Sequence, residues 1–120
     1  MIRIKSIYES RNPDDGYRIF VGAEWPAGAP RGKAAGCEWM KSLGPSANLR
    51  DWMRRNSRKV PSFTDKYLAE LGHNERGIAR VCKLHREFGT VTVLDAPVRE
   101  GETDWRVVET LVSYLRAACE

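Results

Sequence analysis

The sequence predicts an α/β fold: a small three- to four-stranded parallel or mixed sheet, covered by about four to five helices in a single domain. Three observations point to this class. Runs with period-two alternation lie near the start of the chain, amphipathic helical segments fill its centre, and a β-branched run returns after them. Because a strand reached through a helical crossover pairs in parallel with its neighbours, we expect helices to pack against the sheet.

The size and composition of the chain fit one domain over residues 1–120. Hydrophobic residues make up 42% of it and charged residues 30%, which is typical of a globular protein with a buried core. No uncharged apolar run approaches the ~18 residues that a membrane span needs, so no membrane partner is expected. The start of the chain carries Arg3 and Lys5 and has no apolar segment, which argues against a secretory signal.

The first part of the chain is predicted to form strands and loops. Residues 2–8 alternate apolar and polar side chains, and residues 17–21 are rich in β-forming residues, so each is predicted to be a strand. Turn-forming residues at 12–16 separate them. Residues 22–36 are rich in Gly, Ala and Pro and are expected to form a structured loop. Residues 37–43 fit a strand or a short helix, and their period-two apolar face favours a strand.

Three helices are predicted in the centre of the chain. Ser46 can cap a helix that runs to about Asn56, because its hydroxyl can accept from a free amide of the first turn. A second helix is expected to start at residues 61–62, with a capping box at residues 62–65, and to stop at Gly72. Asn74 is expected to cap a third helix over residues 75–88.

The chain is predicted to end with a strand, a loop and a strongly amphipathic helix. The β-branched run at residues 90–94 predicts the last strand. A loop over residues 95–102 follows it. Thr103 or Asp104 is expected to cap the final helix, whose apolar residues are expected to face the core.

The three cysteines, Cys37, Cys82 and Cys119, predict no disulfide framework, since their number is odd and none forms a C-x-x-C pair. Free thiols without an export signal favour a reducing, cytoplasmic location. Cys82 and His85 lie three residues apart on a predicted helix, but zinc needs three or four protein ligands. The pair is therefore interpreted as packing residues, and no metal or cofactor is predicted.

The net charge is +4, and the basic excess is concentrated in residues 41–86, where 11 Lys and Arg face 4 Asp and Glu. Such a region can attract nucleic acid or other phosphates. A solvated helical surface is the interpretation we favour, because charge runs on helices are common in globular domains. Nucleic acid therefore stays an alternative partner that no recognisable binding motif supports.

The candidate ligand-binding residues are Trp25, Lys41, Ser46, Arg50 and Asp95. Ser46 begins a predicted helix between two cations, an arrangement that can hold a phosphate or a carboxylate, although a plain N-cap is the alternative. Trp25 lies in the Gly/Pro-rich loop, where an aromatic ring can stack on a ligand or cover the core. The chain contains no Gly-rich nucleotide-binding motif after a strand.

Five motifs, spread over nearly the whole chain, occur in the order and spacing of a known family. They are D-G-Y-R at 15–18, W-P-x-G at 25–28, W-x-K-x-L-x-P-S-x-x-L-R-x-W at 39–52, F-x-x-x-Y-x-x-E-L at 63–71 and G-T-V-T-V-L at 89–94. They resemble the YeaO-like proteins of the DUF488 family, a family of domains of unknown function. This resemblance implies a small cytoplasmic α/β protein of bacterial type.

Two segments depart from the pattern of that family. The family usually reads V-D-R-L-W-P-R-G where residues 21–28 read V-G-A-E-W-P-A-G, so an acidic residue and two arginines are absent. After the last strand it tends to show Y-A-A-R and then N-H-A, where this chain has D-A-P-V at 95–98 and T-D-W-R at 103–106. Both segments are expected at one end of the sheet, where α/β proteins bind ligands, which implies a degenerate site.

Three functions follow as hypotheses. The first is a small anionic-ligand or protein-partner binding domain with a degenerate active site. The second is an enzyme of unknown reaction, in which Glu24 and Asp95 supply acid–base chemistry beside Lys41 and Arg50. The third is a nucleic-acid-binding or regulatory protein that uses the basic helices of residues 50–86. The sequence leaves the ligand, any catalytic activity and the oligomeric state open.

Overall fold

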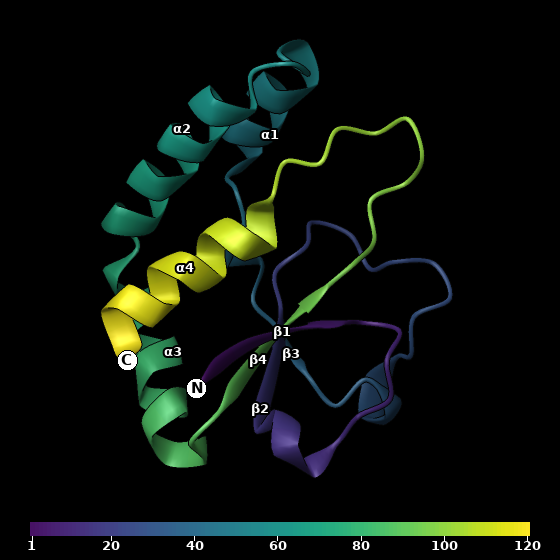
Figure 1. Ribbon diagram of the computed structural model, residues 1–120, viewed down its shortest axis with the longest axis vertical. Helices are drawn as coiled ribbons and strands as arrows, with labels where there is room; N and C mark the ends of the chain where they lie inside the picture. The colour runs from purple at the N-terminus through teal and green to yellow at the C-terminus, as the bar shows by residue number, and fades with distance from the viewer.

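A four-stranded parallel sheet forms the centre of the molecule (Figure 1). The computed structural model describes all residues from 1 to 120. The strands are β1 (Ile2–Ser6), β2 (Tyr17–Phe20), β3 (Glu38–Trp39) and β4 (Val91–Asp95), arranged in the order β1-β4-β2-β3. Every neighbouring pair is parallel. The predicted α/β class is therefore confirmed, with a parallel rather than a mixed sheet.

Four helices lie on one side of this sheet. They are α1 (Ala47–Arg55), α2 (Val60–His73), α3 (Glu75–Phe88) and α4 (Val107–Cys119). Figure 1 shows the helices together on one side, with long loops on the other. None of these helices combines the length and the apolar character needed to cross a bilayer.

The alternation of side chains along the strands divides the buried residues into two clusters. Ile2, Ile19 and Val93 point towards the helices and belong to an apolar cluster of 17 buried residues. The opposite face holds a cluster of only four, namely Ile7, Phe20, Ala29 and Leu94. The three buried polar or charged side chains of the protein are those of Asp15, Arg18 and Thr92. Arg18 and Thr92 alternate along β2 and β4 with residues of the helix-side cluster, so they point to the loop-covered side.

The helix caps predicted at Ser46 and Asn74, and the strand predicted from the β-branched run, are confirmed. The Ser46 hydroxyl accepts a hydrogen bond from the Leu49 amide at 3.1 Å, which places it as the N-cap of α1. The Asn74 side chain accepts from the Gly77 amide at 3.1 Å and caps α3, as expected. In both cases a short polar side chain satisfies an amide that the helix leaves without an internal partner.

Several predicted boundaries were wrong. The helix α2 starts at Val60 and has no side-chain cap, so the capping box at residues 62–65 is absent, and Gly72 lies inside a helix that runs to His73. The helix α4 starts at Val107, because Arg106 takes a left-handed conformation (φ 56°) and donates its amide to the Asp104 carboxylate at 2.9 Å. Strand β3 spans two residues, and a 3₁₀ turn follows it at Lys41–Leu43.

The prediction of three free thiols was also wrong. Cys82 of α3 and Cys119 of α4 form a disulfide, with their Cα atoms 4.9 Å apart. Two helices that pack side by side bring these residues within bonding range, and Cys37 is left as the one free cysteine. The free-thiol argument for a cytoplasmic location therefore loses its support, and that location stays a prediction.

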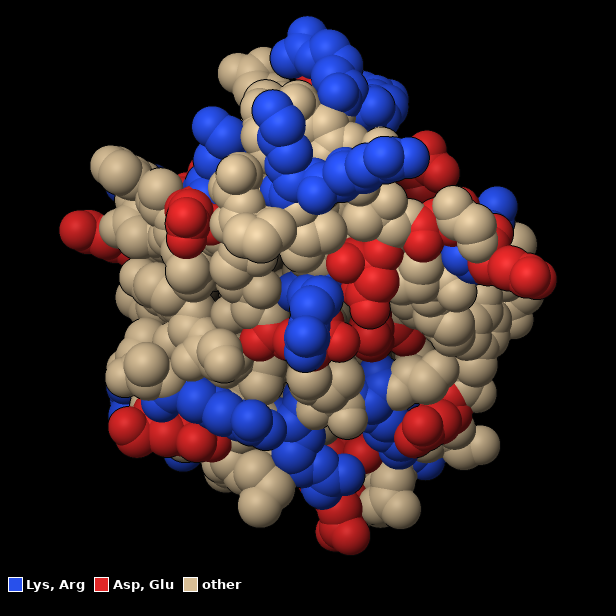
Figure 2. Space-filling model, turned by 45° about the horizontal axis from the view of Figure 1, so that its top comes forward, with Lys and Arg blue, Asp and Glu red and all other residues tan.

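Basic side chains gather on one part of the surface. Arg54, Arg55, Arg58 and Lys59, at the end of α1 and in the turn to α2, are all exposed. Lys and Arg dominate the top of Figure 2, whereas both signs of charge are interspersed over the rest of that face. The basic excess of residues 41–86 is thus partly concentrated at one end of the molecule.

Candidate functional site

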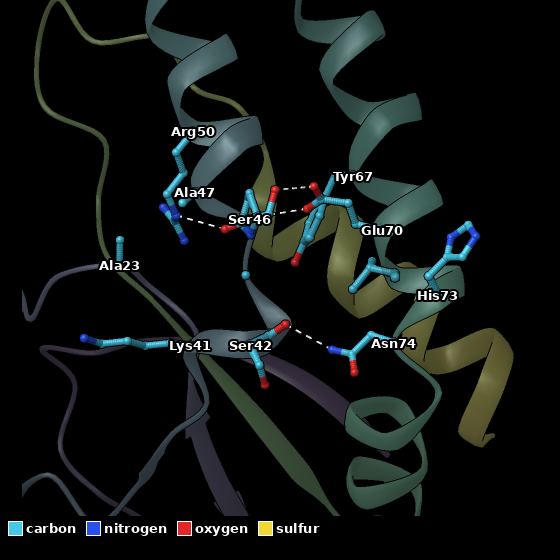
Figure 3. Close-up of a pocket in the computed structure, with 13 residues that line it drawn as sticks. Ala23, Lys41, Ser42, Ser46, Ala47, Arg50, Tyr67, Glu70, His73 and Asn74 are labelled. Atoms are coloured by element: carbon cyan, nitrogen blue, oxygen red, sulfur yellow. Dashed lines mark hydrogen bonds between the residues drawn. The ribbon is translucent and has the colours of Figure 1, made fainter.

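A cavity of about 800 Å³ opens at the carboxyl end of the sheet (Figure 3). It lies between the residues that follow β2 and β3, the first turn of α1 and the second half of α2. Lys41, Ser46 and Arg50 all line it, so the structure brings together three of the five candidate residues. The other lining side chains that matter for its chemistry are those of Ala23, Tyr67, Glu70, His73 and Asn74.

Gly44 brings the start of α1 close to the end of β2. A Cβ atom on this buried residue would lie 2.4 Å from the Val21 carbonyl oxygen and 2.8 Å from Nη2 of Arg50. Only a glycine allows the chain to pass this close to β2. The arrangement places the Arg50 side chain near the segment where the chain departs from the family pattern.

The first turn of α1 is already occupied by a carboxylate of the protein itself. The Ser46 amide donates to Oε1 of Glu70 at 2.8 Å, and the Ser46 hydroxyl donates to the other carboxylate oxygen. An anion is stabilised at this position by the helix dipole and the free amides. Glu70 therefore holds the place where the sequence suggested a ligand anion, and Ser46 has no hydroxyl or amide hydrogen left for a ligand.

Arg50 is the half-buried cation of the cavity. Its Nε donates to the Pro45 carbonyl at 3.0 Å, and it forms no salt bridge within 4.0 Å. Burial lowers the pKa of the guanidinium, while Tyr67 and Glu70 act in the opposite direction. The guanidinium stays charged under these conditions, and its two terminal nitrogens are left to bind an anion in the cavity.

The other basic candidate, Lys41, lies at the rim of the cavity. Its ammonium group is 4.2 Å from the centroid of the Trp39 ring, close enough for a cation–π interaction. Trp39 contacts Trp25 in turn, at 5.4 Å between ring centroids. Trp25 does not line the cavity but packs against the four-residue cluster under the sheet. Its position is that of an aromatic ring that covers the core.

Asp95 lies apart from this cavity. It lines a separate hollow of about 350 Å³, together with Asp104 and Glu109. Burial and the charges of Glu109 and Asp104 raise the pKa of Asp95 to about 6. Glu24 is exposed and lines neither this hollow nor the main cavity, so the two carboxylates of the enzyme hypothesis do not share a site.

The two segments that depart from the family pattern do meet near Arg50. Ala23, at a position where the family usually has arginine, lines the main cavity. Thr103 and Trp105 line a neighbouring hollow of about 470 Å³, and Arg50 lines both. The expected convergence is therefore partial: Arg50 links Ala23 to Thr103 and Trp105, whereas most of residues 95–98 line a separate hollow. The main cavity has an alanine where the resemblance leads one to expect a cation.

Glu70 and Tyr67 are site residues that the sequence argument did not single out. The Tyr67 hydroxyl donates to the Leu43 carbonyl at 2.6 Å, which fastens α2 to the turn before α1. Both residues belong to the F-x-x-x-Y-x-x-E-L motif at 63–71. The motif could have indicated that Tyr67 and Glu70 contact other parts of the chain, because a polar residue on the inner side of a helix usually has a hydrogen-bond partner.

Comparison with known proteins places this fold and site in a family. The family model described as "Inactive DUF488-N3 subclade" matches residues 1–119. The uncharacterized protein YeaO of Escherichia coli is 33% identical over 86 residues, 72% of this chain and 75% of YeaO. The uncharacterized protein Rv3073c of Mycobacterium tuberculosis is 32% identical over 83 residues, 69% of this chain and 70% of that protein. No solved structure matches the chain. The chain belongs to the YeaO-like DUF488 family, within the subclade described as inactive.

Proposed function

We propose that this protein is a non-catalytic binding domain whose main cavity takes a small anionic ligand, a carboxylate or a phosphate, between Arg50 and Lys41. The observation that carries the proposal is the half-buried guanidinium of Arg50, which has no acidic partner within salt-bridge distance. A planar guanidinium with free terminal nitrogens suits an anion with two oxygens, and partial burial strengthens the attraction.

The charges around Arg50 support an incoming anion. Glu70 is the carboxylate that lines the cavity, and both of its oxygens accept hydrogen bonds from Ser46. Lys41 at the rim adds a second cation that can steer the ligand. The ligand is therefore expected to bind beside Arg50 rather than at the amides of α1.

The same geometry argues against catalysis. General acid–base work needs a titratable group within hydrogen-bond reach of the substrate. Glu70 is engaged by Ser46, Asp95 lines another hollow, and Ala23 contributes no charge. His73 lines the cavity but has no free carboxylate beside it with which to form an acid–base pair. The description of the subclade as inactive agrees with a cavity that retains a binding cation without an acid–base pair.

The proposal is tested by titrating the protein with inorganic phosphate and with succinate, followed by NMR, which locates the bound anion and gives the affinity of the site at Arg50. Wild-type protein is expected to bind at least one of them, with shifts centred on the first turn of α1. Arg50→Gln is expected to weaken binding about tenfold or more, since a hydrogen bond to a charged group contributes ~1.5–3 kcal/mol. Arg55→Gln, on the same helix but exposed, is the matched control and is expected to bind as wild type. Equal affinities for both variants would refute the proposal.

Nucleic-acid binding is the second candidate, and the exposed basic group at residues 54–59 favours it (Figure 2). Contacts to phosphates make affinity fall steeply as salt concentration rises. In a filter-binding assay with a mixed-sequence duplex, this candidate predicts a salt-dependent affinity that Arg55→Gln lowers and Arg50→Gln leaves unchanged. The two candidates therefore give opposite results with the same pair of variants.

A further inference from the structure

A second cavity, of about 460 Å³, lies at the opposite end of the sheet from the main cavity, where β2 and β3 begin. Strand β3 pairs with β2 only at Ile19 and Phe20, so the first half of β2 has no strand beside it on this side. Arg11, Arg18 and Cys37 line the space. None of these three residues takes part in the site around Arg50.

Arg18 is a buried cation without sufficient partners. Its side chain is 3% exposed, and its Nε is buried with no hydrogen-bond partner. Its one acidic neighbour is Asp15, whose carboxylate is 3.5 Å from Nη1 of Arg18. That carboxylate already accepts two hydrogen bonds from Lys5, at 2.9 and 3.1 Å. Because a buried charge is costly unless it is fully hydrogen-bonded, the long contact with Asp15 leaves Arg18 short of acceptors, at Nε above all.

Arg11 adds a second cation at the mouth of the same cavity. A Cβ atom on Gly36 would lie 2.7–2.9 Å from Cδ, Nε and Nη1 of Arg11, so the bare glycine allows this side chain to lie against the cavity wall. Gly36 also has a positive φ of 56°, which favours glycine on conformational grounds. Arg11 forms no salt bridge within 4.0 Å.

The acidic group of this cavity is already neutralised. Glu38 accepts hydrogen bonds from Arg80 at 2.5 and 3.2 Å and from the Tyr17 hydroxyl at 2.5 Å. The charged side chains that line the cavity are those of Arg11, Arg18 and Glu38. Glu38 is paired with Arg80, and Asp15, beside Arg18, is shared with Arg3 and Lys5. The local excess of positive charge is concentrated where Arg11 and Arg18 lie.

We propose that this second cavity binds a small oxyanion, a phosphate or a carboxylate, between the guanidinium groups of Arg11 and Arg18. The anion supplies the hydrogen-bond acceptor that the buried Arg18 lacks, and Arg11 closes over it from the exposed side. Arginine suits this role because its planar fork binds two oxygens of one anion at once.

Cys37 is a natural reporter for this site. It is the one free cysteine, and it lines the same cavity as both arginines. Burial raises the pKa of the Cys37 thiol above its ordinary value, and the nearby Arg18 acts in the opposite direction. The rate of alkylation by iodoacetamide depends on the fraction of thiolate, so it responds to the charge of Arg18. A bound anion cancels that influence and covers the sulfur atom. Inorganic phosphate is therefore expected to slow alkylation of Cys37 several-fold at constant pH, whereas chloride at equal ionic strength leaves the rate unchanged.

Three variants complete the test. Arg11→Gln changes an exposed side chain, so it should fold, and it is expected to raise the phosphate concentration needed for half-protection about tenfold. Arg31→Gln, also exposed, is the matched control and should not change it. Arg50→Gln should retain full protection, which separates this site from the main cavity. Absence of protection, equal protection by chloride, or an unchanged response in Arg11→Gln would overturn the proposal.

Discussion

The two faces of the sheet differ in the kind of side chains that are buried on them. The helix-covered face is apolar and contains 17 buried residues in one cluster. The loop-covered face has four, and buried beside them are the charged side chains of Asp15 and Arg18. A loop rich in Gly, Ala and Pro has few large apolar side chains to offer. We infer that the helix face contributes most of the hydrophobic stability, whereas the loop face depends on charge pairing and is the more sensitive to pH and to ions.

Truncation of a leucine on each face gives the largest expected effect. Leu111 of α4 and Leu94 of β4 are both fully buried, one in each cluster. Leu111→Ala is expected to lower the free energy of unfolding by ~3–5 kcal/mol, because closely packed helices cannot collapse into the space. Leu94→Ala is expected to cost ~2–3 kcal/mol, since loops can move to fill it. Urea unfolding of both variants measures the difference, and a larger loss for Leu94→Ala would reverse our ranking of the faces.

Loss of the buried carboxylate tests the loop face directly. Asp15→Ala leaves Lys5 and Arg18 without their shared acidic partner. The expected loss in the free energy of unfolding is ~3 kcal/mol, the lower end of the range for breaking a buried ion pair. The neighbouring Asp14 is exposed, so Asp14→Ala is a matched control with an expected effect within ~0.5 kcal/mol. Similar losses for the two variants would show that the charges of this face do not stabilise the fold.

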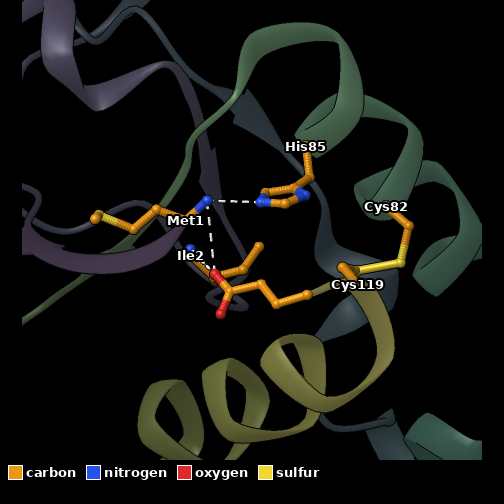
Figure 4. Close-up of a disulfide and its surroundings, with 6 residues drawn as sticks. Met1, Ile2, Cys82, His85 and Cys119 are labelled. Atoms are coloured by element: carbon orange, nitrogen blue, oxygen red, sulfur yellow. Dashed lines mark hydrogen bonds and ion pairs between the residues drawn. A yellow bond between two sulfur atoms is a disulfide. The ribbon is translucent and has the colours of Figure 1, made fainter.

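The disulfide adds a covalent link to the helix face (Figure 4). Reduction, or Cys82→Ser, is expected to lower the free energy of unfolding by ~2 kcal/mol, because the open chain gains conformational freedom when unfolded. Cys37→Ser is the control and should not change the response to reductant. Reduction should also speed hydrogen exchange of the Ile2 amide, which donates to Glu120 just beyond Cys119 at 2.6 Å. An unchanged melting temperature in reductant would contradict this prediction.

The pH dependence of stability should show two opposite effects. Burial, Glu109 and Asp104 raise the pKa of Asp95 to about 6, so the folded state binds this proton more tightly than the unfolded state does. Stability is therefore expected to increase as the pH falls from about 6 towards 4, by ~1–2 kcal/mol after solvent screening. Asp95→Asn should remove this slope in urea unfolding measured at each pH. A slope that persists in the variant must come from another group.

Asp15 gives the opposite pH dependence: its contribution to stability falls as the pH is lowered. Burial alone would raise its pKa, but hydrogen bonds from Lys5 and Asn12 hold the pKa below the ordinary value of 3.8. Its stabilising effect is fully present above that value and is lost as the pH falls through the lower pKa of the folded state. The two effects together predict a maximum of stability near pH 4, a maximum that Asp95→Asn broadens towards neutral pH.

Local patterns were sufficient to predict most of the fold. Period-two alternation identified β1, and a run of β-forming residues identified β2. The caps at Ser46 and Asn74 placed α1 and α3. These features depend on neighbouring residues alone. The start of α4 was wrong because Asp104 binds the Arg106 amide before the helix begins, which keeps Arg106 out of it. Local sequence does not distinguish this arrangement from an ordinary N-cap.

The site was predicted only in part, because its decisive contacts join distant segments. Glu70 reaches Ser46 from 24 residues away, and Cys82 bonds to Cys119 across 37 residues. Such contacts depend on how helices pack, which their own periodicity does not reveal. The odd number of cysteines was misleading in the same way, since three cysteines are also consistent with one pair and one free thiol.

The strand order has a consequence for how the protein folds. Strand β4 lies between β1 and β2, although it is made about 70 residues after β2. Until β4 has left the ribosome, β1 has no partner strand and β2 has only the two-residue β3. Completion of the sheet must therefore wait for the last quarter of the chain, and a topology of such distant pairings is expected to fold slowly. A nascent chain stalled before residue 91 should remain unprotected against protease throughout its β1 segment.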